Sequence, residues 1–129
     1  IAPGKRMLSS MTPTIVTRGD DLAVVTGSPG GRTIINTVFN VVLNILEFEM
    51  GVREAVVAPR YHHQWLPDVA TFEEGSLPDS TIAALEAMGH TLRVRGGQGD
   101  AHTIVFDPKR RVFLGANDLR SADSKVAVP

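Results

Sequence analysis

The short stretch Ser28-Pro29-Gly30-Gly31 combines residue types that could hold a negative charge. It separates a β-branched run from a long pattern of helical spacing, so backbone N–H groups that open the helix have no partner within it. The helix dipole favours negative charge there, and glycine lets a reacting group approach the backbone closely. An ordinary tight β-to-α turn explains the same residues. A nucleotide-phosphate loop does not fit, because the Walker lysine and the full dinucleotide fingerprint are missing.

Ser9 and Ser10 place two hydroxyl groups at the mouth of a predicted strand. Adjacent serines in such a position usually serve a turn or a helix cap. A serine nucleophile needs an adjacent base, and nothing in the sequence places one beside this pair. We therefore expect neither serine to be a nucleophile.

His62 and His63 are the residues that most suggest a metal site. Adjacent residues of an extended segment point to opposite faces, and no second His-x-x-x-His or acidic cluster completes a tetrahedral set. His90 and His102 stand alone in the sequence. We predict no metal and no other cofactor.

The elements that must position these residues begin with two β-branched runs, at residues 14–17 and 22–26, which predict a β-hairpin. Residues 32–50 have helical spacing and are apolar enough to be buried on most sides. We expect Gly51 to end this helix in a left-handed conformation, and residues 52–58 to form a second, short helix. Along the first helix runs a narrow polar stripe, formed by Thr33, Asn36, Thr37, Asn40, Asn44 and Glu47.

The second half of the chain alternates strands with one helix. Residues 60–68 have no clear period, and we expect an ordered but irregular crossing in which Trp65 buries its ring. The elements predicted after it are a strand at 69–72, a helix at 78–89, and strands at 91–95, 103–107 and 112–116. This alternation predicts a layered α/β (α+β) domain that spans residues 1–129.

Three loop predictions complete this reading. Residues 96–100 are rich in glycine, which favours a mobile loop. Lys109-Arg110-Arg111 is the densest basic run, and its position between two strands indicates a solvated hairpin tip. Asp118 and Arg120 are expected to form a local, exposed and weakly stabilising ion pair.

Composition excludes several classes of protein. The 129 residues are 43% hydrophobic and 21% charged, which is ordinary for a folded globular chain. A net charge of −1 with dispersed charges gives no footprint for nucleic acid. No apolar stretch approaches the roughly 20 residues of a membrane-spanning helix. The sequence has no cysteine, which excludes disulfides and thiol catalysis.

Five motifs together resemble the γ-glutamyltransferase family of N-terminal-nucleophile hydrolases. They occur in the expected order and cover nearly the whole chain. The motifs are Leu8-Ser9-Ser10-Met11-Thr12-Pro13-Thr14, Thr26-Gly27-Ser28-Pro29-Gly30-Gly31, Ala58-Pro59-Arg60, His62-His63-Gln64-Trp65-Leu66-Pro67-Asp68 and Gly115-Ala116-Asn117-Asp118.

The resemblance implies a role for each motif that carries chemistry. Gly30 and Gly31 match the glycines whose amides form the oxyanion hole, and Ser9 and Ser10 match the serines that bind the α-carboxylate of the glutamyl substrate. The chain would be the C-terminal part of the small subunit and part of a four-layer αββα sandwich. The nucleophilic threonine of the family opens the small subunit upstream of the serine motif, so it is expected to be absent from this chain, which alone should be inactive.

The same resemblance implies the partners and the surroundings of the protein. The substrates would be glutathione or other γ-glutamyl compounds, with water or an acceptor amino acid or peptide receiving the glutamyl group. The large subunit and the N-terminal part of the small subunit would complete the active site after self-cleavage of a precursor. The family is periplasmic or extracellular.

The sequence departs from the family pattern at Met7, at His102 and at its end, Ser124-Lys125-Val126-Ala127-Val128-Pro129. These departures bear on the substrate. A cephalosporin acylase or a capsule-processing relative is one alternative, and a binding or scaffold domain that has lost its chemistry is another.

Overall fold

A computed structural model describes residues 2–6 and 11–127 and contains two β-sheets. The larger sheet is antiparallel, with the strand order β1-β2-β6-β7. Both predicted hairpins, β1–β2 and β6–β7, are present, and the basic run forms the tip of the second. The strands are β1 (Thr14–Arg18), β2 (Asp21–Gly27), β6 (His102–Asp107) and β7 (Val112–Asn117).

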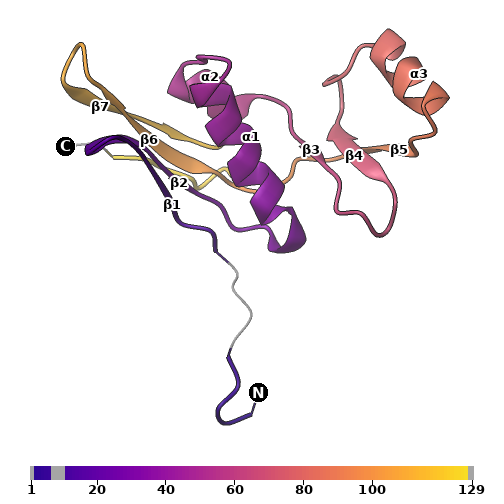
Figure 1. The fold of residues 1–129 in the computed structure, drawn as a ribbon, viewed down its shortest axis with the longest axis horizontal. Helices are drawn as coiled ribbons and strands as arrows, with labels where there is room; N and C mark the ends of the chain where they lie inside the picture. The colour runs from indigo at the N-terminus through magenta and orange to yellow at the C-terminus, as the bar shows by residue number, and fades with distance from the viewer. Residues whose placement is uncertain (1, 7–10, 128–129) are drawn as a thin grey trace.

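Helices α1 (Ile34–Leu46) and α2 (Val52–Val57) lie against one face of this sheet (Figure 1). A core cluster joins the layers through Val41 of α1, Val56 of α2 and Ala116 of β7. On the same face Thr26 and Thr103 are buried, and their hydroxyl groups share a hydrogen bond of 2.8 Å between β2 and β6. Apolar packing therefore joins the helix layer to the sheet layer, and the buried threonine pair links two strands within the sheet.

The opposite face of the larger sheet carries apolar side chains without a covering layer among the described residues. Ile15 pairs with Val25 in the register, and Val25 pairs with Ile104. Ile15 is exposed, while Val25 and Ile104 are half-buried. The described chain thus has one helical layer and one sheet layer at this end.

The smaller sheet has the strand order β3-β4-β5 and lies at the other end of the molecule, together with α3 (Figure 1). Strands β3 and β4 are antiparallel, whereas β4 and β5 are parallel and are joined through α3. The elements of this region are β3 (Tyr61–His62), β4 (Ala70–Glu73), α3 (Asp79–Ala87) and β5 (Leu92–Arg95). The predicted strands at 69–72 and 91–95 and the predicted helix at 78–89 are confirmed as β4, β5 and α3, whereas β3 lies in the segment predicted to be irregular and was not predicted.

The long helix is shorter than its sequence pattern. A 3-10 turn, η1 (Gly31–Thr33), precedes α1, which ends at Leu46. The chain reverses at Glu49, with φ 52°, and the Met50 amide donates to the Asn44 carbonyl. Gly51 has φ −59° and opens α2, so the prediction of a left-handed stop at Gly51 is wrong.

The polar stripe of α1 explains how that helix meets its neighbours. The Asn40 side chain donates to the Tyr61 carbonyl at 3.2 Å, and the Asn44 side chain donates to the Ala55 carbonyl at 3.4 Å. Two asparagines therefore satisfy backbone carbonyls of β3 and α2.

Trp65 does not bury its ring, because 77% of the residue is exposed. The residue has φ 73° and directly follows Gln64, whose side-chain oxygen is hydrogen-bonded to a ring nitrogen of His62 at 2.9 Å. The Gln64 side chain donates to the Leu66 carbonyl at 2.8 Å, which closes this turn. The crossing is irregular, as predicted, but a buried histidine anchors it instead of the tryptophan.

Candidate functional site

The glycine turn between β2 and α1 presents two backbone N–H groups without an acceptor among the described residues, those of Gly30 and Gly31. Both glycines have positive φ, 141° and 60°, a region that favours glycine. The Gly30 carbonyl is engaged, since the Thr33 hydroxyl donates to it at 3.0 Å and the Thr33 amide at 3.3 Å. This carbonyl therefore bonds back into η1, at the start of a helix.

Ser28 fixes this turn through hydrogen bonds, and Gly99 packs closely against it. The Ser28 hydroxyl donates to the Pro29 carbonyl at 2.6 Å and accepts from the Asp100 amide at 2.9 Å. Gly99 lies so close that a Cβ there would be 2.6 Å from the Thr37 hydroxyl oxygen and 2.8 Å from that of Ser28. A Cβ on Gly30 would in turn be 3.3 Å from the Gly99 Cα. The turn and the 96–100 loop thus meet at a contact that only glycine allows at position 99.

The 96–100 loop, predicted to be mobile, is closely packed at its C-terminal end. Gln98 is 4% exposed, its amide donates to a Glu73 carboxylate oxygen at 3.0 Å, and its carbonyl accepts from Arg60 at 2.8 Å. The glycine content of the loop indicated flexibility, but Gly99 instead allows the loop backbone to pack closely against Thr37 and Ser28.

Behind this loop lies a buried ionic network of four residues, Arg60, Asp118, Arg120 and Glu73. Arg60 and Asp118 are 1% and 0% exposed, and an Arg60 guanidinium nitrogen lies 2.7 Å from an Asp118 oxygen. Arg120 contacts Asp118 at 2.9 Å and forms a bidentate pair with Glu73. The prediction of an exposed, weak Asp118–Arg120 pair is therefore wrong, because partners from β4 and from the α2–β3 junction bury it.

The network keeps both of its carboxyl groups ionised. Burial alone would raise the pKa of Asp118, but hydrogen bonds from the Ala101 and Arg120 amides and the charge of Arg60 lower it below its usual value. Burial likewise opposes ionisation of Glu73, and the Arg120 side chain with two backbone amides outweighs it and lowers this pKa. Each buried charge has several partners, as a buried charge requires.

Sequence reasoning missed Glu73 and gave Arg60 no role beyond membership of a motif. The spacing of Asp118 and Arg120 was visible, but their partners lie 58 and 47 positions earlier in the chain, respectively. The sequence feature that could have drawn attention to Arg60 is its position directly after Pro59, at the end of a predicted helix.

A cavity of about 630 Å³ adjoins the glycine turn, with Ser28, Pro29 and His102 in its lining. Ser9 and Ser10 lie outside the described residues, so no position is assigned to them. Met11, the first described residue after them, lines this cavity.

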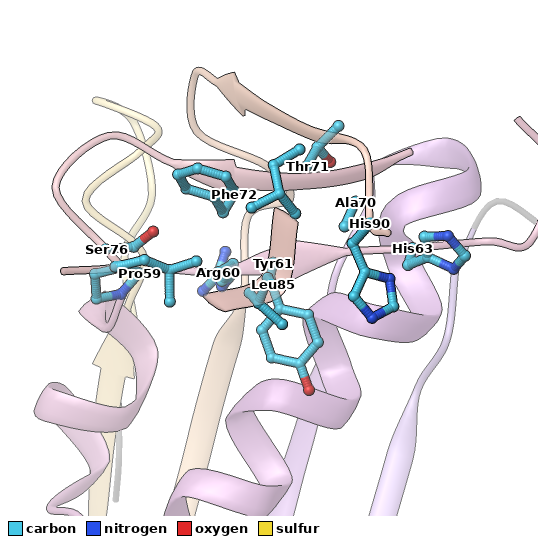
Figure 2. A pocket seen from close by; sticks show the side chains of 12 residues that line it. Pro59, Arg60, Tyr61, His63, Ala70, Thr71, Phe72, Ser76, Leu85 and His90 are labelled. Atoms are coloured by element: carbon cyan, nitrogen blue, oxygen red, sulfur yellow. The ribbon is translucent and has the colours of Figure 1, made fainter. Parts of the chain in front are cut away.

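A second cavity, of about 460 Å³, lies between the smaller sheet and α3 (Figure 2). Figure 2 shows Tyr61 and Leu85 near its centre, with His63 and His90 to one side. Its lining is mainly apolar and has no carboxylate. Ser76 uses its hydroxyl group to donate to the Glu73 carbonyl, so the cavity offers no nucleophile with an adjacent base.

The adjacent histidines point to different surroundings. His62 is buried and bonds Asn36 and Gln64 through its two ring nitrogens, both at 2.9 Å. His63 is exposed and contacts Asp68 at 3.0 Å. In the part of the chain that the structure describes, no three His, Asp or Glu side chains gather as metal ligands would. None of the described helices is both long and apolar enough to cross a membrane.

Comparison with known proteins gives close matches over the whole chain. The family model described as gamma-glutamyltranspeptidase matches residues 1–128. The glutathione hydrolase proenzyme of Escherichia coli is 44% identical over 127 residues, which cover 98% of this chain and 22% of that protein. The acylase ACY 1 proenzyme of a Pseudomonas strain is 33% identical, with 99% of this chain and 22% of that protein covered. The chain thus spans about a fifth of the length of these relatives.

A solved structure shares the fold. The Helicobacter pylori gamma-glutamyltranspeptidase T380A mutant is 41% identical, with a TM-score of 0.88 over 94% of this chain and 66% of that one. The predicted α/β class is confirmed, and the two sheets correspond to a part of that larger fold.

Proposed function

This chain belongs to the gamma-glutamyltranspeptidase family, and we propose that it forms part of an enzyme that cleaves the γ-glutamyl amide of glutathione and related compounds. Water or an acceptor amino acid or peptide receives the glutamyl group. Residues 1–129 contribute the oxyanion hole to an active site that other parts of the parent polypeptide complete. We also propose a periplasmic or extracellular location, as the resemblance to the family implies.

The observation that carries this proposal is the pair of unpaired amides at Gly30 and Gly31, at the start of a helix. A threonine hydroxyl from elsewhere in the parent attacks the γ-carbonyl carbon, and its own α-amine takes the hydroxyl proton. The carbonyl oxygen becomes an oxyanion that accepts hydrogen bonds from the two amides. The amine leaves with the proton, and water then hydrolyses the glutamyl ester. In this proposal the attacking threonine lies outside residues 1–129, so we expect the chain alone not to catalyse this reaction.

Ser9 and Ser10 are proposed to donate hydrogen bonds to the α-carboxylate of the glutamyl group. Hydrogen bonds to a charged acceptor are stronger than neutral ones, so two hydroxyl donors suit this task. Met11, which follows the two serines in the sequence, lines the cavity beside the glycine turn.

Two alternatives differ in chemistry. The similarity to the acylase ACY 1 proenzyme favours a related acylase, which would turn over a glutaryl amide in preference to glutathione. A scaffold domain without catalysis would come from a parent sequence that lacks the threonine upstream. Assays with glutathione and with a glutaryl amide distinguish the proposed enzyme from the related acylase. The parent sequence distinguishes both from the scaffold domain.

The oxyanion hole is tested by Gly31→Val in the full-length parent enzyme. A Cβ at position 31 meets no described atom within 4 Å, so a valine side chain has room beside the Gly31 amide. Single-turnover acylation by a chromogenic γ-glutamyl anilide should slow on the order of 10²- to 10³-fold.

Gly19→Val is the matched control, since Gly19 has φ 63° in the β1–β2 turn and equally open surroundings. It carries the same backbone strain as Gly31→Val, far from the proposed chemistry. Circular dichroism and thermal melting of both variants separate rate from folding. A folded Gly31→Val enzyme that acylates at the rate of the Gly19→Val enzyme would show that the turn is not the oxyanion hole.

A further inference from the structure

A third cavity, of about 390 Å³, is lined by three arginines, Arg32, Arg93 and Arg95. All three are exposed, none of their side chains forms a hydrogen bond or an ion pair with a described residue, and no carboxylate is in the lining. Three like charges around one hollow repel one another in the absence of an anion. The cavity therefore has the electrostatic character of an anion-binding site.

The fold brings the arginines together from two elements. Arg93 and Arg95 are two positions apart on β5, so their side chains leave the same face of the smaller sheet. The register places Thr71 of β4 beside Arg93, and His62 of β3 beside Thr71. Arg32 comes from η1. One face of the sheet thus meets the start of the first helix across this cavity.

The polar neighbours of the arginines are already committed to other partners. Glu73 pairs with Arg95 in the register, but its carboxylate accepts from Arg120 and from the amides of Arg60 and Gln98. His62, which lines the cavity, has both ring nitrogens bonded to side-chain amides. The guanidinium groups are the free donors of this cavity, within the described residues. Their planar donor pairs match the two oxygens of a carboxylate.

The position of Arg32 relates the cavity to the proposed oxyanion hole. Arg32 follows Gly31 directly, so their Cα atoms are about 3.8 Å apart. A γ-glutamyl amide bound with its carbonyl oxygen at Gly30 and Gly31 has its leaving amine within a few bonds of this point. In glutathione that amine belongs to a dipeptide, which spans at most about 7 Å and ends in a carboxylate.

We propose that Arg32, Arg93 and Arg95 bind the carboxylate of the leaving peptide, and equally that of an acceptor amino acid or peptide. The acceptor amine attacks from the place that the leaving amine vacates, so one carboxylate subsite serves both. This inference rests on the proposed function, and it distinguishes this carboxylate from the α-carboxylate assigned to Ser9 and Ser10.

The test compares glutathione with its C-terminal amide, which differs by one negative charge, in the full-length parent enzyme. The wild type should have a lower KM for glutathione than for the amide. In R93A/R95A the KM for glutathione should rise up to about tenfold, because charge-assisted hydrogen bonds from two exposed arginines are lost, while the KM for the amide stays the same. R110A, which removes an arginine at the exposed β6–β7 hairpin tip, should leave both KM values unchanged.

A neutral γ-glutamyl anilide separates this inference from the proposed function. If neither the wild-type enzyme nor any variant turns over the anilide, the proposed function is wrong. If the anilide is turned over and glutathione has no advantage over its amide in the wild type, the carboxylate subsite is overturned.

The three arginines could instead bind carboxylates of the parent polypeptide itself. In that case R93A/R95A would yield little folded enzyme, and the wild type would show no preference between acid and amide. Where R93A/R95A does not fold, R32Q provides the same KM comparison. An increase of the wild-type KM for glutathione, but not for the amide, at high salt supports the subsite, and equal behaviour of the two donors contradicts it.

Discussion

Gly99 shows how a single missing side chain shapes the candidate site. Replacing it by alanine adds a Cβ 2.6 Å from the Thr37 hydroxyl oxygen and 2.7 Å from the Thr37 methyl carbon, and Thr37 is fully buried. Gly99 also has φ 74°, where a side chain adds strain. We expect Gly99→Ala to lower the free energy of unfolding by roughly 2 kcal/mol or more, through overpacking and strain together.

Gly75→Ala is the control for this substitution in a urea unfolding experiment. Gly75 has φ 70°, and a Cβ there would meet no described atom within 4 Å. It therefore carries the strain without the clash, and the difference between the two variants isolates the packing of the loop against the turn. If both variants lost the same free energy of unfolding, the close contact of Gly99 with Thr37 would not contribute to stability.

At the scale of elements, the buried ionic network joins segments that are distant in the sequence. Arg120, after β7, pairs with Glu73 of β4 and donates to the carbonyls of Val56 and Ala58 at the end of α2. Removing its guanidinium leaves the buried carboxylate of Asp118 and the partly buried carboxylate of Glu73 short of a partner. We expect Arg120→Ala to cost about 3–5 kcal/mol of unfolding free energy, the usual effect of breaking a buried ion pair.

The matched change is Arg110→Ala at the β6–β7 hairpin tip, whose backbone amide bonds Asp107 and whose side chain is exposed. Loss of an exposed side chain there should change stability by about 0.5 kcal/mol or less. Chemical denaturation of both variants checks the contrast. A small effect of Arg120→Ala would show that solvent replaces its partners at little cost.

The same elements show what sequence can predict. Strands and helices followed from periods of two and of three to four residues, because those periods reflect local geometry. The burial of Asp118 could not follow, since it depends on Arg60, which only the tertiary fold brings near. Trp65 misled for a related reason: residue type indicates burial on average, but a turn with positive φ points this ring outward. In the candidate site, the turn at Gly30 was predictable and its support by Gly99 was not.

At the scale of the whole molecule, the ionic network lies where the two sheets meet, so their association should depend on pH. The pKa values of Asp118 and Glu73 are lowered in the folded chain from reference values of 3.8 and 4.5. On acidification the unfolded chain therefore takes up these protons first, which favours unfolding. The stabilisation from both carboxylates is fully present above about pH 5 and is lost as the pH falls through 4 and below.

Denaturation from pH 7 to pH 3 measures this loss, and Glu73→Gln tests its origin. Glutamine keeps the size of the side chain but does not titrate, so the variant should be less stable at pH 7 and should lose less further stability on acidification. Asp68→Asn provides the comparison, because the Asp68 side chain is 82% exposed and its one hydrogen bond or ion pair with a described residue is to His63. Its pH profile should follow that of the wild type. If Glu73→Gln also followed the wild type in slope, the acid sensitivity would have to come from charges outside the joint between the sheets.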